Sequence, residues 1–359
     1  MEVLFERRNG LGIIALNRPR ALNALSLDML RAIHARLDDW ARDGSLQAVL
    51  LRAAQPGLFC AGGDVRAVCR SGNLPPAVDV DVYFRAEYRL NQAIHDFPKP
   101  WIAFLDGVTM GGGAGISVHG AFRIATENTL FAMPETRIGL VPDVGAGFFL
   151  NRCPGAAGLY LALTAARIRA ADMLDLGLAT HFMPAAALPA LEQGLSAADW
   201  SAFPPLETVE RILVPLLENP GDAPLQAEYG MIEQCFNTPA ADGVPAILEA
   251  LSAFSGEGAA QAAAAVRAGS PTALLLTLKH LRAARGLSLR DCLAVEYRLS
   301  QFCAARPDFQ EGVRAALLDK DRNPRWRPAT LAAAAEEDLD AAFSWNAGTD
   351  PGLWPAAAS

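Results

Sequence analysis

The stretch Trp101–Asp143 decides the fold and reads WIAFLDGVTMGGGAGISVHGAFRIATENTLFAMPETRIGLVPD. An apolar, strand-like run, Trp101–Leu105, leads into three consecutive glycines that begin at Gly111 and can open a helix. Glycines between a strand and a helix leave backbone N–H groups open to a ligand that approaches closely. Two acids, Glu135 and Asp143, follow in a Gly- and Pro-rich segment. Amide donors with nearby carboxylates suit acyl-group chemistry.

Upstream of this stretch the sequence predicts a mixed α/β pattern. Strand-like runs at 3–5 and 12–16 flank an Asn-Gly turn signal. Ser26 is a plausible N-cap for a helix that reaches about Arg42, and a second helix is expected from about Asp79 to Asp96. Within the opening stretch, residues 122–125 and 129–132 are expected to form a second strand pair.

Three consecutive regions are predicted along the chain. Residues 1–185 would form an α/β core that holds the site, and residues 186–324 a helical region rich in Ala and Leu. The segment 325–359 is rich in Pro, Ala and acids, and is expected to be draped over the surface or partly disordered.

Composition narrows the class of protein. The chain has 359 residues, of which 52% are hydrophobic and 19% charged, as in globular proteins with a large core. A net charge of −8 argues against nucleic-acid binding. The sequence shows no apolar run of transmembrane length and no h-region of signal-peptide type, so we expect no membrane partner. A cytoplasmic protein, or a matured organellar one, is the default.

The six cysteines contain no CxxC pair, and their spacing fits neither a zinc site nor a disulfide framework. We therefore expect reduced cysteines in the core and no metal. A dinucleotide fingerprint begins at Gly113, but Val118 stands where its third glycine would be. Ser117 and His119 nearly match a G-x-S-x-G nucleophile elbow, with His119 in place of the last glycine. A serine hydrolase built on Ser117 is kept as an alternative.

A second Gly-bearing turn, Ala61-Gly62-Gly63, also follows strand-like residues. Two convergent backbone N–H groups can bind an oxyanion, and losing one such donor typically costs about 3–4 kcal/mol of barrier. This would be a reason for the two glycine turns to meet, although their spacing in the sequence cannot show that they do.

Five blocks in order across the chain carry a family resemblance. They read LNRPRALNALSLDML (16–30), FCAGGDVRAV (59–68), MGGGAGISVHG (110–120), FAMPETRIGLVPDVGAGFFL (131–150) and DFQEGVRAALLDKDRNPRW (308–326). Together they resemble the crotonase, or enoyl-CoA hydratase/isomerase, superfamily, and within it the 3-hydroxyisobutyryl-CoA hydrolase branch. The resemblance implies a spiral of ββα units with a helical C-terminal region.

The resemblance also implies a reaction. An acyl-CoA thioester oxygen would sit between the N–H groups of Ala61 and Gly112. Hydratases of the superfamily carry two glutamates twenty residues apart. Here Glu135 fills the second place and Gly115 the first, while Asp143 replaces a glycine. The hydrolase branch shares both departures, so the implied reaction is hydrolysis of 3-hydroxyisobutyryl-CoA, a step of valine breakdown.

In this reaction Glu135 would attack the thioester as a nucleophile or act as a base on water, and the sequence leaves both open. Asp143 would bind the 3-hydroxyl group or handle the water and the leaving thiolate. Glu87 matches a substrate-contacting position, so the implied substrate-binding set is Glu87, Gly112, Glu135 and Asp143.

Cations for the CoA phosphates are expected at Arg66, Lys320 and Arg322. No cofactor is implied, since coenzyme A is part of the substrate, and a homo-oligomer is possible. Two further functions stay open: an enoyl-CoA isomerase or hydratase, and an acyl-CoA-binding protein without turnover.

Each acid also has a purely structural interpretation. Glu135 could be a first-turn helix acid, and Asp143 could cap the helix that follows it. Glu87 could lie on a solvated helix face and pair with an arginine.

Overall fold

The computed structural model describes residues 1–69, 78–237, 243–344 and 353–354. It divides into two compact units, each assembled from three segments. The sheet unit contains Met1–Gly63, Leu90–Phe131 and Ile168–Pro224, and the helical unit contains Asp64–Arg89, Ala132–Arg167 and Leu225–Ser359. These units are interleaved along the chain, whereas the sequence predicts consecutive regions that meet near residues 185 and 324.

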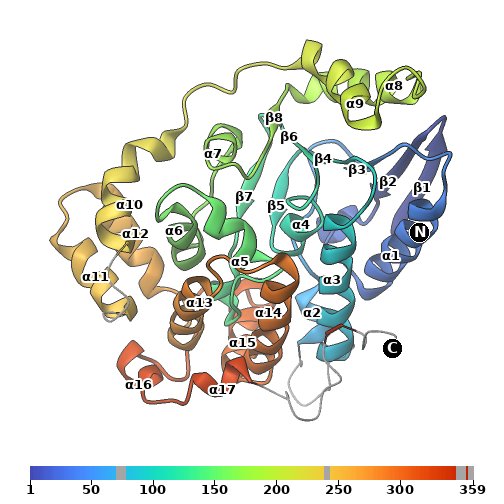
Figure 1. Ribbon diagram of the computed structural model, residues 1–359. Helices are drawn as coiled ribbons and strands as arrows, with labels where there is room; N and C mark the ends of the chain where they lie inside the picture. Colours follow the sequence, from blue (N-terminus) through green and yellow to red (C-terminus); the bar gives the residue numbers. More distant parts are fainter. Residues whose placement is uncertain (70–77, 238–242, 345–352, 355–359) are drawn as a thin grey trace. The chain divides into compact units, whose positions relative to one another are not determined.

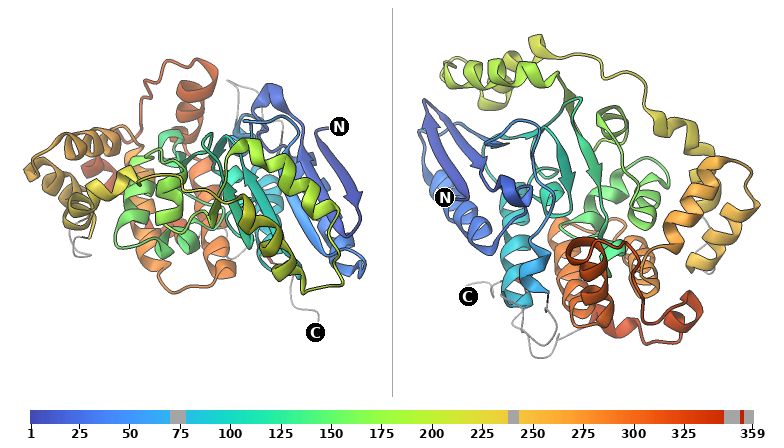
Figure 2. Two further views of the ribbon diagram at one scale, coloured as in Figure 1. Left: turned by 90° about the horizontal axis from the view of Figure 1, so that it is seen from above. Right: turned by 180° about the vertical axis from the view of Figure 1, so that it is seen from behind.

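The sheet unit is built on parallel strands with one antiparallel hairpin at an edge (Figure 1). Within the described residues the main sheet has the order β1 (Val3–Arg8), β2 (Leu11–Leu16), β3 (Ala48–Ala53), β4 (Trp101–Leu105), β6 (Phe122–Ala125) and β8 (His181–Phe182). β1 and β2 are antiparallel, and the following neighbours are parallel. The blue β1–β2 hairpin lies at the edge of the sheet in every view (Figure 2).

A smaller sheet joins β5 (Val108–Met110) and β7 (Leu130–Ala132). The predicted pairing of segments 122–125 and 129–132 is therefore wrong, because β6 pairs with β4 and β8 whereas β7 pairs with β5. Both segments have the composition of strands, and composition does not determine the partner of a strand.

Helices of the sheet unit cover both faces of the main sheet. They are α1 (Leu27–Arg42), α4 (Gly112–Gly115), α7 (Ala170–Asp175), α8 (Leu188–Ser196) and α9 (Pro205–Leu213). Odd-numbered residues of β2, such as Ile13, share a buried apolar cluster with residues of α8 and α9. Successive strand residues point to opposite faces, so the even-numbered residues of β2 face the other way, where Gly12 lies against Trp40 of α1.

The sequence signals for α1 are confirmed. The Ser26 hydroxyl accepts a hydrogen bond from the Met29 N–H at 3.2 Å, and the helix ends at Arg42 as expected. This cap satisfies one of the N–H groups that have no partner inside a helix.

Apart from Ala132, the last residue of β7, the described residues of the helical unit form helices and the segments that connect them (Figure 1). Its helices are α2 (Val65–Val68), α5 (Ala146–Phe149), α6 (Ala157–Thr164), α10 (Tyr229–Phe236), α11 (Gly243–Ala253), α12 (Glu257–Arg267), α13 (Pro271–Ala283), α14 (Leu289–Ala304), α15 (Pro307–Val313), α16 (Leu331–Ala335) and α17 (Asp340–Phe343). Helix α3 (Val80–His95) begins in this unit and ends in the sheet unit.

The tail expected to be draped or disordered is partly helical, because α16 and α17 lie within it. Thr330 caps α16 by accepting the Ala333 N–H at 3.2 Å. Glu337, just beyond α16, forms an ion pair with Arg306 at 2.5 Å. The tail residues 345–352 and 355–359 lie outside the described residues.

Gly12 provides a test of the packing between α1 and the sheet. A Cβ atom at this position would lie 2.8 Å from Cζ3 of Trp40, a ring that is 5% exposed. We expect Gly12→Ala to lower the free energy of unfolding by about 1–3 kcal/mol, since overpacking forces the ring to shift. Urea denaturation followed by circular dichroism measures this change.

The matched control is Gly44→Ala, where a Cβ atom would meet nothing within 4 Å. Its effect should stay within about 0.5 kcal/mol. Equal stability losses in the two variants would contradict the packing described here.

Candidate active site

The two glycine turns of the sheet unit meet. Cys60 and Thr109 form a parallel bridge, with the Cys60 N–H donating to the Val108 carbonyl at 2.8 Å. A Cβ atom on Gly62 would lie 3.3 Å from the Met110 carbonyl oxygen and 3.9 Å from the Gly112 nitrogen. The φ of +121° at Gly62 therefore strongly favours glycine, and a Cβ atom at this position would also make a tight contact with the second turn.

Ala61 is the wrong donor for an oxyanion. Its N–H donates to the Leu22 carbonyl at 3.0 Å and so is already engaged. Among the described residues, the N–H groups of Gly62 and Gly63 donate to no acceptor, and Gly63 is the more exposed of the two. The available amide in this turn is therefore Gly63.

Gly112 keeps its predicted place. It is the first residue of α4, so its N–H has no acceptor within that helix. Gly113 beside it could not be another residue, because its Cβ atom would lie 2.4 Å from the Cys60 carbonyl oxygen. The second turn thus supplies a free amide close to the first turn.

Glu135 lies in the helical unit, on a short 3₁₀-helix, η2 (Glu135–Ile138), that packs directly on α15. Gly139 ends η2 with φ +73°, and a Cβ atom there would lie 2.5 Å from the Asp308 carbonyl carbon. A Cβ atom on Gly312 of α15 would lie 2.4 Å from the Ile138 Cα. Two glycines therefore allow backbone-to-backbone packing, which fixes the turn that carries Glu135.

Glu135 and Asp143 are both buried, each 5% exposed, so neither acts as an ordinary surface helix acid. Oε2 of Glu135 has no hydrogen-bond partner among the described residues. Asp143 does not cap α5, which has no side-chain N-cap. Instead its Oδ2 accepts a hydrogen bond from the Tyr88 hydroxyl at 2.5 Å, and that hydroxyl is 2.6 Å from Oγ of Ser300.

Glu87 is also buried in the helical unit. Its side chain is 2% exposed, and within the described part of the chain Oε1 has no partner. The arginine on this helix, Arg85, pairs with Asp81 at 2.9 Å. The interpretation of Glu87 as a solvated, arginine-paired residue is therefore wrong.

Burial sets the protonation of these acids. It raises the pKa of Glu135 and of Glu87 well above the usual value, and the negative charge of Asp143 raises both further. Burial also raises the pKa of Asp143, to about 7, although the hydrogen bond from Tyr88 acts to lower it. Carboxylates that interact so strongly cannot all ionise near neutral pH. The cluster therefore holds at least one proton that it can donate.

Sequence reasoning missed a fourth buried acid, Glu296 of α14. Its Oε2 accepts the Gly145 N–H at 2.6 Å, and its Oε1 accepts the Gly147 N–H at 2.8 Å. His280 of α13 lies 3.0 Å from Oε1 through its Nε2. The position of His280 in the sequence fits no metal-ligand spacing and predicts only a structural role. No local motif links these residues to the turn after Asp143.

The turn held by Glu296 has an unusual backbone. Val144 has φ +52° and Gly145 has φ +91°, both in the left-handed region. For a β-branched residue such as Val144 this conformation costs about 1–3 kcal/mol, so surrounding contacts must maintain it.

Ser117 does not have the surroundings of a nucleophile. Its side chain is fully buried, and its hydroxyl donates to the carbonyls of Gly113 at 2.8 Å and Ala114 at 3.0 Å. A serine hydroxyl that donates to a carbonyl three or four residues earlier is a common structural arrangement. The alternative of a serine hydrolase built on Ser117 is therefore not supported.

The predicted phosphate-binding cations all lie in the helical unit. Arg66 is exposed, and its Nη2 donates to the Leu317 carbonyl at 2.5 Å. Lys320 and Arg322, a few residues further along the chain, are exposed and have φ values of +59° and +54°.

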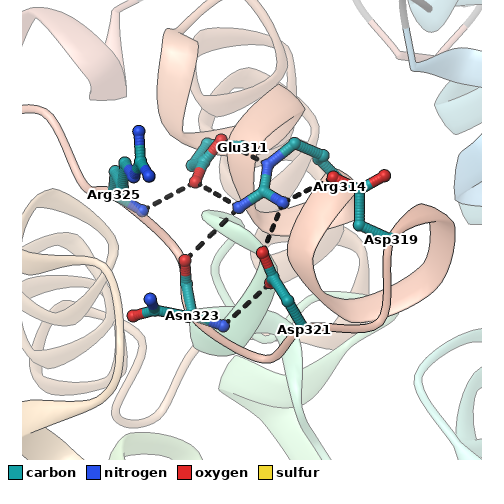
Figure 3. A network of polar contacts seen from close by, with 6 residues as sticks. All are labelled: Glu311, Arg314, Asp319, Asp321, Asn323 and Arg325. Atoms are coloured by element: carbon teal, nitrogen blue, oxygen red, sulfur yellow. Dashed lines mark hydrogen bonds and ion pairs between the residues drawn. The ribbon is translucent and has the colours of Figure 1, made fainter.

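Arg314 organises the loop that carries Lys320 and Arg322 (Figure 3). Its guanidinium contacts Asp319 at 2.6 Å, Asp321 at 2.7 Å and the Asn323 carbonyl at 3.3 Å. Glu311 pairs with the same guanidinium and also accepts the Arg325 N–H at 2.7 Å. The acids of this loop are thus occupied by Arg314.

Two global features of the described residues bear on partners and redox state. No helix there is long and apolar enough to span a membrane. All six cysteines are buried and free, as expected.

The buried acids predict how stability depends on pH. Burial raises the pKa of folded Asp143 to about 7, whereas an unfolded aspartate titrates near 3.9. Between these values the folded chain binds a proton that the unfolded chain has lost, so stability falls as pH rises from about 4 to 7. We expect Asp143→Asn to reduce this decline by about 1.4 kcal/mol per pH unit, measured by urea denaturation at a series of pH values.

Asp199→Asn is the control. Hydrogen bonds from Ser201 lower the pKa of Asp199, so it stays ionised across this range and its removal should leave the slope unchanged. If the free energy of unfolding of Asp143→Asn fell with pH as steeply as that of the unmodified chain, the raised pKa of folded Asp143 would be refuted.

Comparisons with known proteins identify the family of this chain. The family model described as enoyl-CoA hydratase/isomerase matches residues 11–343. The chain is 43% identical to 3-hydroxyisobutyryl-CoA hydrolase, mitochondrial, of Danio rerio (96% of this chain, 89% of the relative). It is 41% identical to the Homo sapiens protein of the same name (95% and 88%).

Two solved structures share the fold over nearly their full length. A carnitinyl-CoA dehydratase from Mycobacterium thermoresistibile has a TM-score of 0.89 and 38% identity, covering 99% of both chains. An enoyl-CoA hydratase from Rhodobacter sphaeroides has a TM-score of 0.85 and 35% identity, covering 99% of this chain and 100% of its own. The predicted crotonase-like α/β fold is thereby confirmed, and the chain belongs to the enoyl-CoA hydratase/isomerase family.

Proposed function

We propose that this protein hydrolyses an acyl-CoA thioester, and that its substrate is 3-hydroxyisobutyryl-CoA, which yields 3-hydroxyisobutyrate and coenzyme A. The observation that carries the proposal is the buried set of Glu87, Glu135 and Asp143, combined with a glycine at position 115. Addition of water to a C=C bond needs acid–base work at two carbons. The relatives named 3-hydroxyisobutyryl-CoA hydrolase support the choice of substrate.

In the proposed mechanism the thioester oxygen accepts hydrogen bonds from the N–H groups of Gly63 and Gly112. These donors stabilise the negative charge that develops on the oxygen as the carbonyl carbon becomes tetrahedral. Gly63 replaces Ala61 in this role, because the N–H of Ala61 already donates to Leu22. The mechanism requires these donors and the carboxylates to act on the same substrate.

Glu135 supplies the attack on the carbonyl carbon in its ionised form, so its buried carboxyl must first lose the proton that its raised pKa retains. As a nucleophile it forms a mixed anhydride while the C–S bond breaks, and water then hydrolyses the anhydride. As a base it removes a proton from the water that attacks directly. Hydrolysis in oxygen-18 water under single-turnover conditions separates the two routes, because only the anhydride route can place the label in Glu135.

Asp143 is proposed to manage the proton. With a pKa of about 7 it is partly protonated at neutral pH, so it can donate to the leaving thiolate and then accept from water. Glu87 is proposed to contact the acyl group. The unsatisfied Oε1 of Glu87 suits a hydroxyl donor such as the 3-hydroxyl of the substrate.

The reaction is proposed to need no cofactor, since the thiol leaves without any redox step. Arg66, Lys320 and Arg322 are proposed to bind the CoA phosphates, because they are exposed and the neighbouring acids are engaged by Arg314. The cytoplasm is the proposed compartment, although the relatives named above carry the word mitochondrial.

Hydration or dehydration of an acyl-CoA is the second candidate, because the two solved neighbours are named for these reactions. Gly115, which offers no side chain for the second acid of a hydratase, argues against it. The assay follows the ultraviolet absorbance of the double bond in an enoyl-CoA. Loss of this absorbance without release of a thiol would favour this candidate.

The proposed roles of Glu135 and Asp143 can be tested by removing each carboxylate. With 3-hydroxyisobutyryl-CoA as substrate, thiol release should fall by at least about 100-fold in Glu135→Gln and in Asp143→Asn, since general acid–base catalysis contributes 10²–10⁴-fold. Ser117→Ala should retain activity within a few fold. An undiminished rate in Glu135→Gln, or no thiol release from the unmodified protein, would reject the proposal.

The proposed binding of the CoA phosphates by Lys320 and Arg322 can be tested by removing both cations. The double variant Lys320→Ala, Arg322→Ala should raise KM for the CoA ester by roughly tenfold, which corresponds to about 1.4 kcal/mol, and leave kcat unchanged. Arg42→Ala, at another exposed arginine, serves as the charge control and should leave KM unchanged. A lower kcat with an unchanged KM in the double variant would contradict the proposal that these two cations bind the CoA phosphates.

A further inference from the structure

Helix α14 reaches the surroundings of Asp143 with two side chains one turn apart, Glu296 and Ser300. Residues four apart share one face of a helix, so both belong to the same surface of α14. Glu296 bonds the backbone just after Asp143, whereas Ser300 contacts Tyr88, which bonds the Asp143 carboxylate itself. A single helix therefore acts on Asp143 indirectly in two ways, through the backbone that follows Asp143 and through the Tyr88 hydroxyl that bonds its carboxylate.

A carboxylate is specifically suited to the place of Glu296. The N–H groups of Gly145 and Gly147 both point at it, and each takes a different oxygen. Glutamine has only one acceptor oxygen, so it would leave one of these N–H groups facing an NH₂ group. The left-handed backbone at Val144 and Gly145 depends on contacts that keep it in place.

His280 holds Glu296 from the other side. Because a carboxylate oxygen only accepts hydrogen bonds, Nε2 of His280 donates to Oε1. A Cβ atom on Gly147 would lie 2.8 Å from the same Nε2, so the ring lies directly against the turn. Both side chains are almost completely buried, at 1% exposure or less, which limits their movement.

We infer that Glu296, held by His280, is a positioning residue for the reaction: it fixes the turn Val144–Gly147 and thereby the place of the Asp143 carboxylate. This inference rests on the proposed hydrolase function for its kinetic consequence. Its consequence for the titration of Asp143 does not depend on any substrate. Glu296 is not expected to touch the reacting atoms.

The charges around Asp143 make the inference testable. The groups that act on its carboxylate or are influenced by it are Glu87 and Tyr88 of α3, Glu135 of η2, and Glu296 and Cys303 of α14. Among them, the charge of Glu296 raises the pKa of Asp143, whereas the hydrogen bond from Tyr88 lowers it. Removing one or the other should therefore move the pKa of Asp143 in opposite directions.

The experiment compares Glu296→Gln with Tyr88→Phe in the full-length protein. Carbon-13 NMR of labelled aspartate carboxyls, assigned with Asp143→Asn, should show a lower Asp143 pKa in Glu296→Gln and a higher one in Tyr88→Phe. With 3-hydroxyisobutyryl-CoA, kcat of Glu296→Gln should fall by roughly 10–100-fold while KM stays within about threefold, since displacement of a reacting group chiefly affects the chemical step.

Glu233→Gln is the matched control. Glu233 of α10 also accepts a backbone N–H, from Ala156 just before α6 at 2.9 Å, but no residue of the proposed site contacts it. This variant should keep the kcat and the Asp143 titration of the unmodified protein. Gly147→Ala keeps Glu296 but pushes a methyl group against His280, so it should also lower kcat and provides a second test if Glu296→Gln does not fold.

An unchanged kcat or an unchanged Asp143 pKa in folded Glu296→Gln would overturn the inference. Shifts of the same sign in Glu296→Gln and Tyr88→Phe would also overturn it, because they would indicate general loosening. If the unmodified protein released no thiol, the hydrolase function would fail, while the NMR titrations would still decide whether Glu296 acts on Asp143.

Discussion

The removal of the carboxyl groups of Glu87, Glu135, Asp143 and Glu296 from water is a constraint on which the helical unit depends. A buried charge is costly unless it is hydrogen-bonded, paired or neutralised by a proton. Glu296 meets this cost structurally, with two amides and an imidazole on its two oxygens. Glu87 and Glu135 each keep an oxygen that no described residue bonds, and their pKa values are raised well above the usual range instead. The same constraint therefore separates a supporting acid from acids that remain free to react.

Close packing of backbone against backbone is a second feature of the structure, and glycine residues make it possible in both units. In the sheet unit, Gly62 and Gly113 let two turns pack closely against each other through their backbones. In the helical unit, Gly139 and Gly312 let η2 and α15 touch through their main chains. Main-chain contacts of this kind leave little freedom for a turn to move. Reactive groups on such turns are held in place before any ligand arrives, which lowers the cost of ordering them.

Local signals in the sequence predicted several strands and helices and singled out Glu135 and Asp143, whereas the crotonase-like arrangement was predicted from the resemblance of five blocks. The cap at Ser26 and the glycine turns depend on short motifs. The engagement of Ala61 by Leu22 could not be read from its own block, because the acceptor lies far upstream. Glu296 and His280 lie well over a hundred residues beyond Asp143 and carry no motif that points to it. The pairing of β6 and β7 with different strands likewise depends on tertiary contacts rather than on composition.

The interleaving of the two units has a consequence for synthesis on the ribosome. Glu135 and Asp143 emerge long before α13, α14 and α15, the helices that bury and brace them. Until those helices are made, both carboxyls stay hydrated and ionise as ordinary acids do. The nascent chain therefore carries the two proposed catalytic acids in their ordinary, ionised form. Their unusual affinity for protons arises only when the last third of the polypeptide folds around them.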